Sequence, residues 1–110
     1  INRQGVEGQA DGGLVMGMGY ALMEDYHLEE GKSRSRDLST YMIPTSMDIP
    51  EIEYAFVEKP DPNGPYGAKG IGELPLLPMA PAITNAIYDA TGIWCNQLPI
   101  KRERLKVSRR

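Results

Sequence analysis

The sequence has the size and composition of one small globular domain. Its 110 residues are 41% hydrophobic and 25% charged, with a formal net charge of −3, which is ordinary for such a domain. This charge gives no general attraction to nucleic acid, and the basic residues concentrated in 101–110 predict only a solvated terminal helix or tail. No stretch approaches the roughly 18 uninterrupted apolar residues that a membrane span requires. Nucleic-acid-binding and membrane-spanning classes are therefore disfavoured.

The chain carries few residues that bind metals. It has one cysteine, Cys95, and one histidine, His27, so an intrachain disulfide and the common zinc sites are excluded. We expect Cys95 to be a small buried hydrophobic residue and His27 to be structural or exposed. Any metal must therefore arrive inside a cofactor, and we predict no metal ligand from the chain itself.

Helical periodicity is the first regular pattern in the chain. Residues 1–8 are polar and contain glycine, and we expect them to form a connection. From Gln9 to Asp25, the side chains of Leu14, Met18 and Leu22 recur every four residues. This spacing predicts a helix.

The same helix has a second face with almost no side chains. Gly13, Gly17 and Ala21 also recur at four-residue spacing. Together with Gly12 and Gly19, the glycines cost about 4 kcal/mol relative to alanine if all four are helical. Tertiary contact must offset this cost, through close helix–strand packing or the close approach of a bulky ligand.

Strand signals follow in the middle of the chain. Residues 26–30 alternate weakly up to Gly31 and predict a short strand and turn, whereas 32–37 read as a charged loop. Two prolines in 38–50 favour extended, irregular backbone. Ile52, Tyr54 and Phe56 alternate with Glu53, Ala55 and Val57, which predicts the clearest strand in the chain, mostly buried.

A second helix is predicted for about 80–91. Pro81 suits its first position and Gly92 its C-terminal cap, and an apolar stripe lies between them. Residues 93–100 are expected to cross the core as an extended segment before a charged terminal turn. The fold class is therefore α+β (mixed α/β), with two helices packed on a small, partly incomplete sheet.

The glycine-rich stretch from Gly67 to Glu73 carries the candidate site. Its three glycines allow positive φ and close approach of the backbone to another group. The apolar run 74–78 would put Glu73 at the edge of an apolar surface that excludes water, which makes it a candidate general base. The alternative is an acidic residue that stabilises a helix start by about 0.3–1 kcal/mol. Lys69 followed by Gly70 does not fit a P-loop, and the dinucleotide fingerprint also fails.

Three elements resemble, in order, the C-terminal part of the molybdopterin-binding large subunit of the xanthine dehydrogenase/aldehyde oxidase family. They are Val6-Glu7-Gly8-Gln9-X-X-Gly12-Gly13, then Tyr41-X-Ile43-Pro44 with Asp48-X-Pro50, and Gly67-Ala68-Lys69-Gly70-X-Gly72-Glu73. The third element is the specific one, and the resemblance covers nearly the whole chain.

The resemblance implies a catalytic role for Glu73 as the base beside molybdenum. It also implies that Gln9, Gly70, Ile71 and Gly72 lie at the cofactor, which is molybdopterin with or without a cytosine dinucleotide extension. The implied reaction is hydroxylation of an aromatic heterocycle or an aldehyde by water. Desolvation by the apolar run after Glu73 would raise the proton affinity of its carboxylate and strengthen it as a base.

The family's large subunit is much longer than this sequence. Residues 1–110 are therefore expected to be a C-terminal segment of a molybdopterin-binding domain, inactive alone, and the start at Ile1 agrees with a fragment or processed chain. The implied partners are the remainder of the subunit and domains or subunits with FAD and 2Fe-2S clusters, in a cytoplasmic oligomer. The alternatives are a relative acting on carbon monoxide or an aromatic CoA thioester, and a non-catalytic assembly module.

Overall fold

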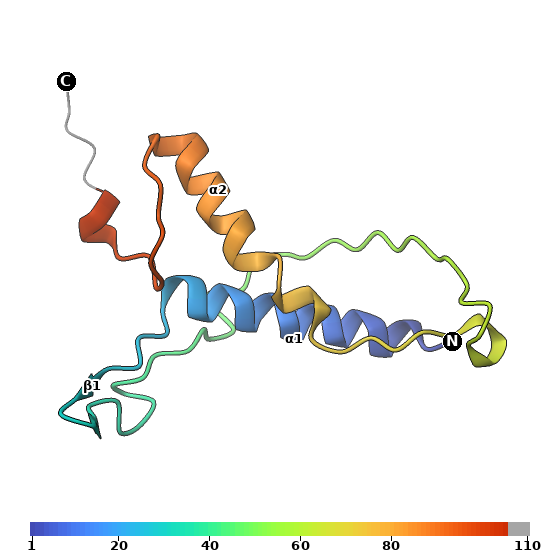
Figure 1. Ribbon diagram of the computed structural model, residues 1–110, viewed down its shortest axis with the longest axis horizontal. Helices are drawn as coiled ribbons and strands as arrows, with labels where there is room; N and C mark the ends of the chain where they lie inside the picture. The colour runs from blue at the N-terminus through green and yellow to red at the C-terminus, as the bar shows by residue number, and fades with distance from the viewer. Residues whose placement is uncertain (106–110) are drawn as a thin grey trace.

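The computed structural model describes residues 1–105, and two α-helices dominate it (Figure 1). They are α1 (Arg3–Leu22) and α2 (Met79–Thr91). Strands β1 (Leu28–Glu29) and β2 (Lys32–Ser33) pair antiparallel, with Leu28 opposite Ser33. Three 3-10 turns complete the regular structure, namely η1 (Pro65–Gly67), η2 (Leu74–Leu76) and η3 (Arg102–Leu105). The predicted mixed class of helices with a small sheet is confirmed.

Helix α1 begins earlier than its apolar periodicity suggested. The Asn2 side chain accepts a hydrogen bond from the Gly5 N–H at 2.9 Å and caps the helix. Arg3 and Glu7 form an ion pair one turn apart. Because the cap satisfies a free N–H of the first turn, the chain is already helical at Arg3. The prediction of a connection over residues 1–8 is therefore wrong.

The glycine face of α1 packs closely against another part of the same chain. Gly13, Gly17 and Ala21 are all buried. A Cβ added at Gly13 would lie 2.9 Å from the Pro75 Cβ, and one added at Gly17 would lie 2.5 Å from the Met79 Cβ. The contact predicted to offset the glycines therefore exists, but its partner is η2 and the first turn of α2 rather than a strand.

Helix α2 matches its prediction closely. Gly92 adopts the left-handed conformation, with φ 71°, and its N–H donates to the Tyr88 carbonyl at 2.7 Å. This is the C-terminal arrangement that glycine favours. Pro81 is the third residue of the helix rather than the first, a position where the missing N–H still costs no intrahelical bond.

Residues 93–100 return the chain from α2 to the end of α1. Ile100 is 6% exposed, and its N–H donates to the Ala21 carbonyl at 2.8 Å. The following residue, Lys101, pairs with Asp25 and holds the pKa of that carboxyl below its usual value. The segment thus ends in the core as predicted, and η3 follows it. Residues 106–110 of the predicted tail lie outside the described residues.

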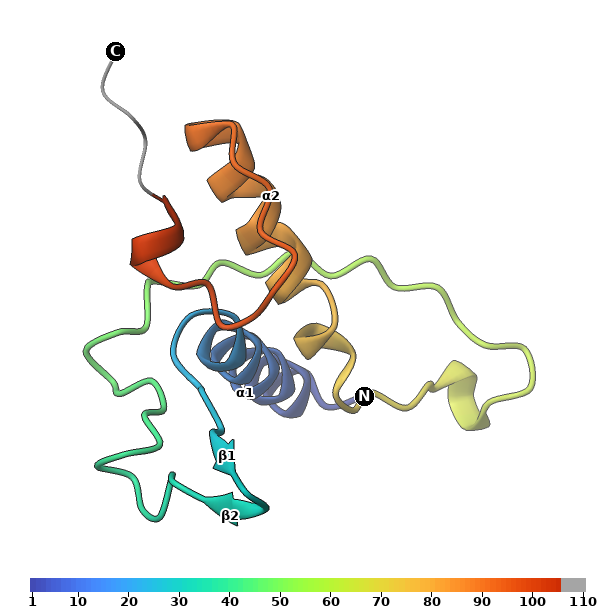
Figure 2. The same cartoon turned by 60° about the vertical axis from the view of Figure 1, so that its left-hand side comes forward.

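The strand pair forms a hairpin that stands away from the helices (Figure 2). Its turn residues Glu30 and Gly31 have φ 50° and 76°, the positive values typical of a tight hairpin turn. The strand predicted within 26–30 is confirmed, and Lys32–Ser33 is its partner rather than the predicted loop.

Residues 51–60 contain no regular structure, so the prediction of a mostly buried strand at 52–57 is wrong for this chain. Val57 is 95% exposed, and the segment arcs away from α2 in Figure 1. A strand exists only when a second strand pairs with it, and no described residue supplies that second strand. The alternation shows which side chains share a face of the segment, but it does not show whether a second strand is present to pair with it.

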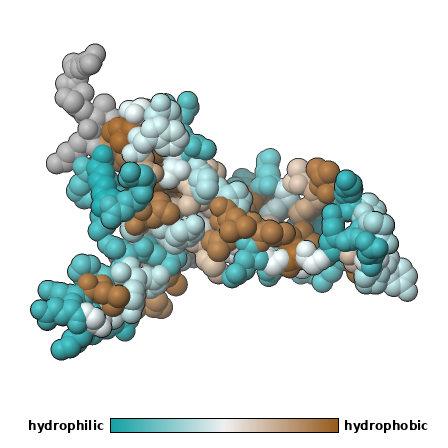
Figure 3. All heavy atoms as spheres, in the orientation of Figure 1, coloured by the Kyte–Doolittle hydropathy of each residue, from teal (hydrophilic) through white to brown (hydrophobic). Residues whose placement is uncertain are grey.

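The described residues form an open structure with a small core. Their radius of gyration is 17.8 Å, compared with about 13 Å for a compact domain of about 100 residues. The buried hydrophobic residues are Ala21, Ala80 and Ile100, whereas Trp94 is 65% exposed. Figure 3 shows apolar side chains open on this face of the molecule. The chain by itself therefore leaves much of its apolar surface uncovered.

Candidate functional site

The first predicted site residue, Gln9, meets the glycine-rich loop directly. Its Nε2 donates a hydrogen bond to the Gly72 carbonyl at 3.2 Å, across 63 positions of sequence. Gln9 lies one helical turn before Gly13 and two before Gly17, on the same face of α1. This face therefore runs along the chain from Gly72 through η2 to Met79, and it fixes where the loop ends.

The other end of the loop is fixed by a turn. The Asp61 N–H donates to the Gly67 carbonyl at 3.0 Å. Gly67 has φ 78°, and a Cβ there would lie 2.9 Å from the Pro60 Cβ, so glycine is required. The predicted positive φ occurs only here, because Gly70 and Gly72 do not adopt it. Of the three glycines that allow positive φ, only Gly67 therefore uses this freedom.

Between these fixed ends, the backbone of residues 70–73 is open. All four residues are exposed, and a Cβ added at Gly70 or Gly72 would meet nothing within 4 Å. Their N–H groups form no hydrogen bond with any other residue of 1–105. Four successive donors are therefore free to bind acceptor atoms of a group outside the chain, which can approach the two glycines closely.

The Glu73 carboxylate is exposed and has no partner among the described residues. Glu73 precedes η2, and its carbonyl accepts from the Leu76 N–H at 3.0 Å, but its side chain makes no capping hydrogen bond. It forms no ion pair within 1–105. The alternative role was an acidic residue that stabilises a helix start through the macrodipole. It is weakened because α2 begins six residues after Glu73, beyond the first turn to which this effect is confined.

The apolar surface predicted beside Glu73 is present, but its side chains are exposed in this chain. Leu74 is 61% exposed and Leu77 is 67% exposed. Desolvation of the Glu73 carboxylate therefore requires that another part of the protein or a cofactor cover these two side chains. The described residues alone do not provide it.

The sequence alone missed the residues that hold the loop in place. Pro75, Leu76 and Met79 contact the glycine face of α1, and none of them was singled out. Some signal was available, because Gln9, Gly13 and Gly17 share one spacing of four and so one face. This shared face indicates that Gln9 and the glycines meet the same neighbour, an inference that we did not draw from the sequence, and it does not identify that neighbour.

The remaining candidate groups lie elsewhere or are not assembled. His27 is exposed beside the hairpin, and Cys95 is only half-buried rather than buried as predicted. Within residues 1–105, no three His, Cys, Asp or Glu side chains come close enough together to hold a metal ion. In that same range, no helix has the length and apolar character needed to cross a bilayer. The residues that do assemble are Gln9 and the Gly70–Glu73 loop.

Comparison with known proteins gives this arrangement a context. Residues 1–50 match the family model of a molybdopterin cofactor-binding domain. A putative xanthine dehydrogenase molybdenum-binding subunit from Escherichia coli K12 is 45% identical over 101 residues, which are 90% of this chain and 13% of that protein.

Two solved structures are similar in fold and sequence. Quinoline 2-oxidoreductase from Pseudomonas putida 86 gives a TM-score of 0.87 at 32% identity, over 96% of this chain and 14% of that one. A Cu,Mo-containing CO dehydrogenase gives 0.75 at 32% identity, over 84% and 12%. The chain thus spans only 12% to 14% of these relatives.

The fold and these matches define a segment of a molybdopterin cofactor-binding subunit. The chain belongs to the xanthine dehydrogenase/aldehyde oxidase family, as the three sequence elements predicted.

Proposed function

We propose that this chain is the C-terminal segment of a molybdenum hydroxylase subunit, an oxidoreductase in which Glu73 is the general base. Gln9, Gly70, Ile71 and Gly72 border the molybdopterin cofactor in this proposal. The hydrogen bond between Gln9 and Gly72 carries it. That bond joins two separately predicted site residues beside a carboxylate that has no other described partner.

The open loop fits a cofactor rich in hydrogen-bond acceptors. The free N–H groups of residues 70–72 would bind those acceptors, and the two glycines would allow close approach. When bound, the cofactor would supply the two-electron oxidation, and FAD and 2Fe-2S centres on partner domains or subunits would take the electrons onward. A cytosine dinucleotide extension of the cofactor would add further acceptors.

The protein's own share of the reaction is proton transfer. Hydroxylation of a C–H bond by water gives two electrons, two protons and the oxygenated product, which is a hydroxy heterocycle or its oxo tautomer from a heterocycle and a carboxylic acid from an aldehyde. Glu73 would accept one of these protons on its carboxylate, while Gln9 holds the loop through Gly72. The substrate class is an aromatic heterocycle or an aldehyde. The likeness to the quinoline and xanthine enzymes supports the heterocycle, and the likeness to aldehyde oxidoreductase molybdenum-binding subunits supports the aldehyde.

Two observations bear on the alternative functions, which are carbon monoxide oxidation and a non-catalytic assembly module. The likeness to CO dehydrogenase supports carbon monoxide as an alternative substrate. The non-catalytic assembly module would use the glycine face of α1 and the Glu73 loop only for packing against another subunit. That face is instead filled by the chain's own Pro75, Leu76 and Met79, so it is not available for such packing.

Metal analysis and turnover of the complete subunit with its partners test the proposal. Elemental analysis should find molybdenum in proportion to the subunit, and a panel of heterocycles and aldehydes should include a substrate that reduces a dye acceptor. Turnover with carbon monoxide alone would select the second candidate. A pure, folded complex without molybdenum would end the cofactor assignment.

A substitution of Gln9 tests the hold on the loop. Gln9→Met keeps the length of the side chain but removes the amide that donates to Gly72. One hydrogen bond contributes about 0.5–1.5 kcal/mol, so we expect turnover to fall about 2- to 10-fold with unchanged molybdenum content. Gln4→Met is the matched control, because Gln4 is an exposed residue of the same helix. Equal turnover in the two variants would remove Gln9 from the site.

A further inference from the structure

Residues 51–58 have the sequence of a strand but lack a partner for their backbone. Apolar and aromatic residues alternate with others from Ile52 to Val57. Among residues 1–105, nothing makes a hydrogen bond to the N–H or C=O groups of 51–60. Such a segment presents a complete set of strand-pairing groups to its surroundings.

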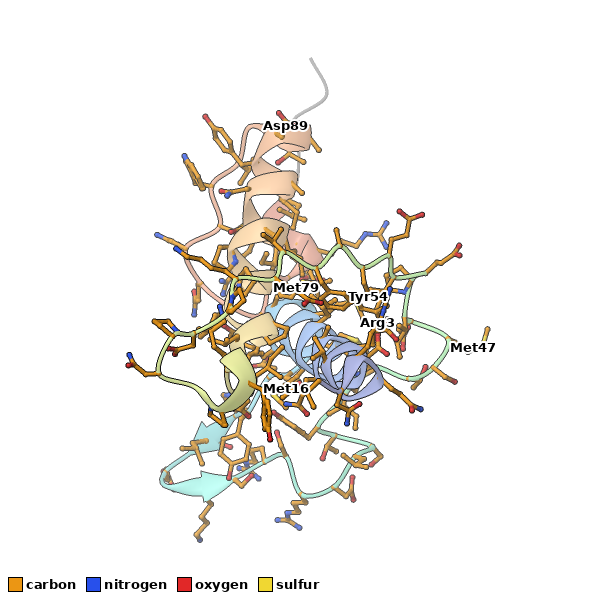
Figure 4. All side chains as sticks on the ribbon, turned by 90° about the vertical axis from the view of Figure 1, so that its right-hand side faces the viewer. Arg3, Met16, Met47, Tyr54, Met79 and Asp89 are labelled. Carbon is orange, nitrogen blue, oxygen red and sulfur yellow. The ribbon has the colours of Figure 1, made fainter. Side chains whose placement is uncertain are left out.

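One face of this segment is already anchored on α1. The Tyr54 hydroxyl donates a hydrogen bond to the Asp11 carboxylate. The rings of Tyr54 and Phe56 are stacked, with centroids 6.0 Å apart and planes 4° apart, and the Arg3 guanidinium lies 5.6 Å from the Phe56 centroid. Figure 4 shows Tyr54 and Arg3 on the same side of α1. Residues 54 and 56 point to the same side, as they do in a β-strand.

This anchoring leaves the opposite face and the backbone edges open. Val57, which alternates with Tyr54 and Phe56 and so belongs to the opposite face, is 95% exposed. Eight extended residues span about 26 Å at about 3.3 Å per residue, enough for a full ladder of hydrogen bonds with a second strand. Aromatic and β-branched residues, which the segment contains, favour such pairing.

We infer that residues 51–58 form a β-strand that pairs with a strand from the part of the same subunit outside this chain. The inference rests on the proposed function, in that it takes the chain as one segment of a longer subunit. The matched relatives support this occupant over a second copy, because about six-sevenths of their length lies outside the matched region. The strand would thereby dock α1, and the Gln9 end of the site, onto that sheet.

Hydrogen–deuterium exchange of the complete subunit tests this inference. Peptides covering 51–58 should exchange about 100-fold or more slowly than an unstructured peptide, although these amides are unbonded within 1–105. Exchange at the unstructured rate would overturn the inference. Protection that disappears on dilution would overturn it as well, because it would assign the pairing to a second copy.

Proline substitutions locate the pairing. Ala55→Pro and Glu58→Pro occupy positions of opposite parity, so one of them removes an N–H that faces the partner strand. We expect that variant to lose protection across 51–58. Ser46→Pro is the control, because Ser46 is the second residue of the Thr45–Asp48 turn, where proline is favoured, and it should leave protection unchanged. If the proline variants do not fold, the exchange of the unmodified subunit still decides.

This test is separate from the test of the proposed function, since exchange requires neither molybdenum nor turnover. A subunit without molybdenum but with protected residues 51–58 would end the proposed function and keep this inference. A molybdenum-loaded, active subunit with unprotected residues 51–58 would keep the proposed function and end this inference.

Discussion

Replacing Glu73 by Gln in the complete enzyme should lower turnover by about 10²- to 10⁴-fold, the contribution of a positioned general base. The amide has nearly the shape of the carboxylate but does not accept the proton. Glu73 makes no capping bond or ion pair within residues 1–105, so the substitution should leave the fold and the molybdenum content unchanged. Steady-state kinetics and elemental analysis of the same preparation provide the two measurements.

The control for this prediction is Glu103→Gln, which changes an exposed glutamate on η3. It carries the same loss of charge and should leave turnover within about 2-fold, the ordinary effect of a surface substitution. Turnover of the Glu73→Gln enzyme within a few-fold of the unmodified enzyme, at full molybdenum content, would show that Glu73 is not the base. A large loss of molybdenum would instead identify Glu73 as a residue that holds the cofactor.

Local signals predicted the elements whose ends are marked by the sequence. Helix α2 was predicted because Pro81 and Gly92 bracket an apolar stripe, and Gly92 has the required left-handed conformation. The start of α1 was missed although Asn2 is a good N-cap residue. Gly5 and Gly8 lower the helix propensity there, so the apolar periodicity becomes visible only later.

Long-range partners could not be predicted in the same way. The glycine face of α1 indicated that another segment packs closely on it. That segment, η2 and Met79, lies about 60 residues away in the sequence, and no sequence pattern connects it to the glycines. Alternation over 52–57 reported which side chains share a face, and it carried no information about a second strand. Glu73 and Gln9 were found through a motif, whereas their relative position follows from one hydrogen bond that only the structure reveals.

Gly17→Leu should separate Gln9 from the Gly70–Glu73 loop, because η2 and the first residue of α2 pack directly on Gly17. A Cβ at position 17 would lie 2.5 Å from the Met79 Cβ and 3.0 Å from the Leu76 carbonyl oxygen. Both atoms are fixed by backbone, so no rotamer change relieves the overlap. The higher helix propensity of leucine offsets about 1 kcal/mol at most, whereas overpacking costs about 1–3 kcal/mol and occasionally more, and overlap with atoms fixed by backbone belongs at the upper end of this range. The net effect is destabilisation.

The measurable consequences are a lower unfolding temperature and the loss of molybdenum from the purified enzyme, since the Gly72–Glu73 loop follows η2 when η2 is displaced from α1. Met16→Leu is the matched control. It puts a leucine one residue earlier, at a side chain that is 47% exposed and that Figure 4 shows on a different side of α1 from Met79. Leucine and methionine have similar volumes, so this variant should retain its stability and molybdenum. Equal stability and metal content in the two variants would mean that the glycine face of α1 does not hold the loop.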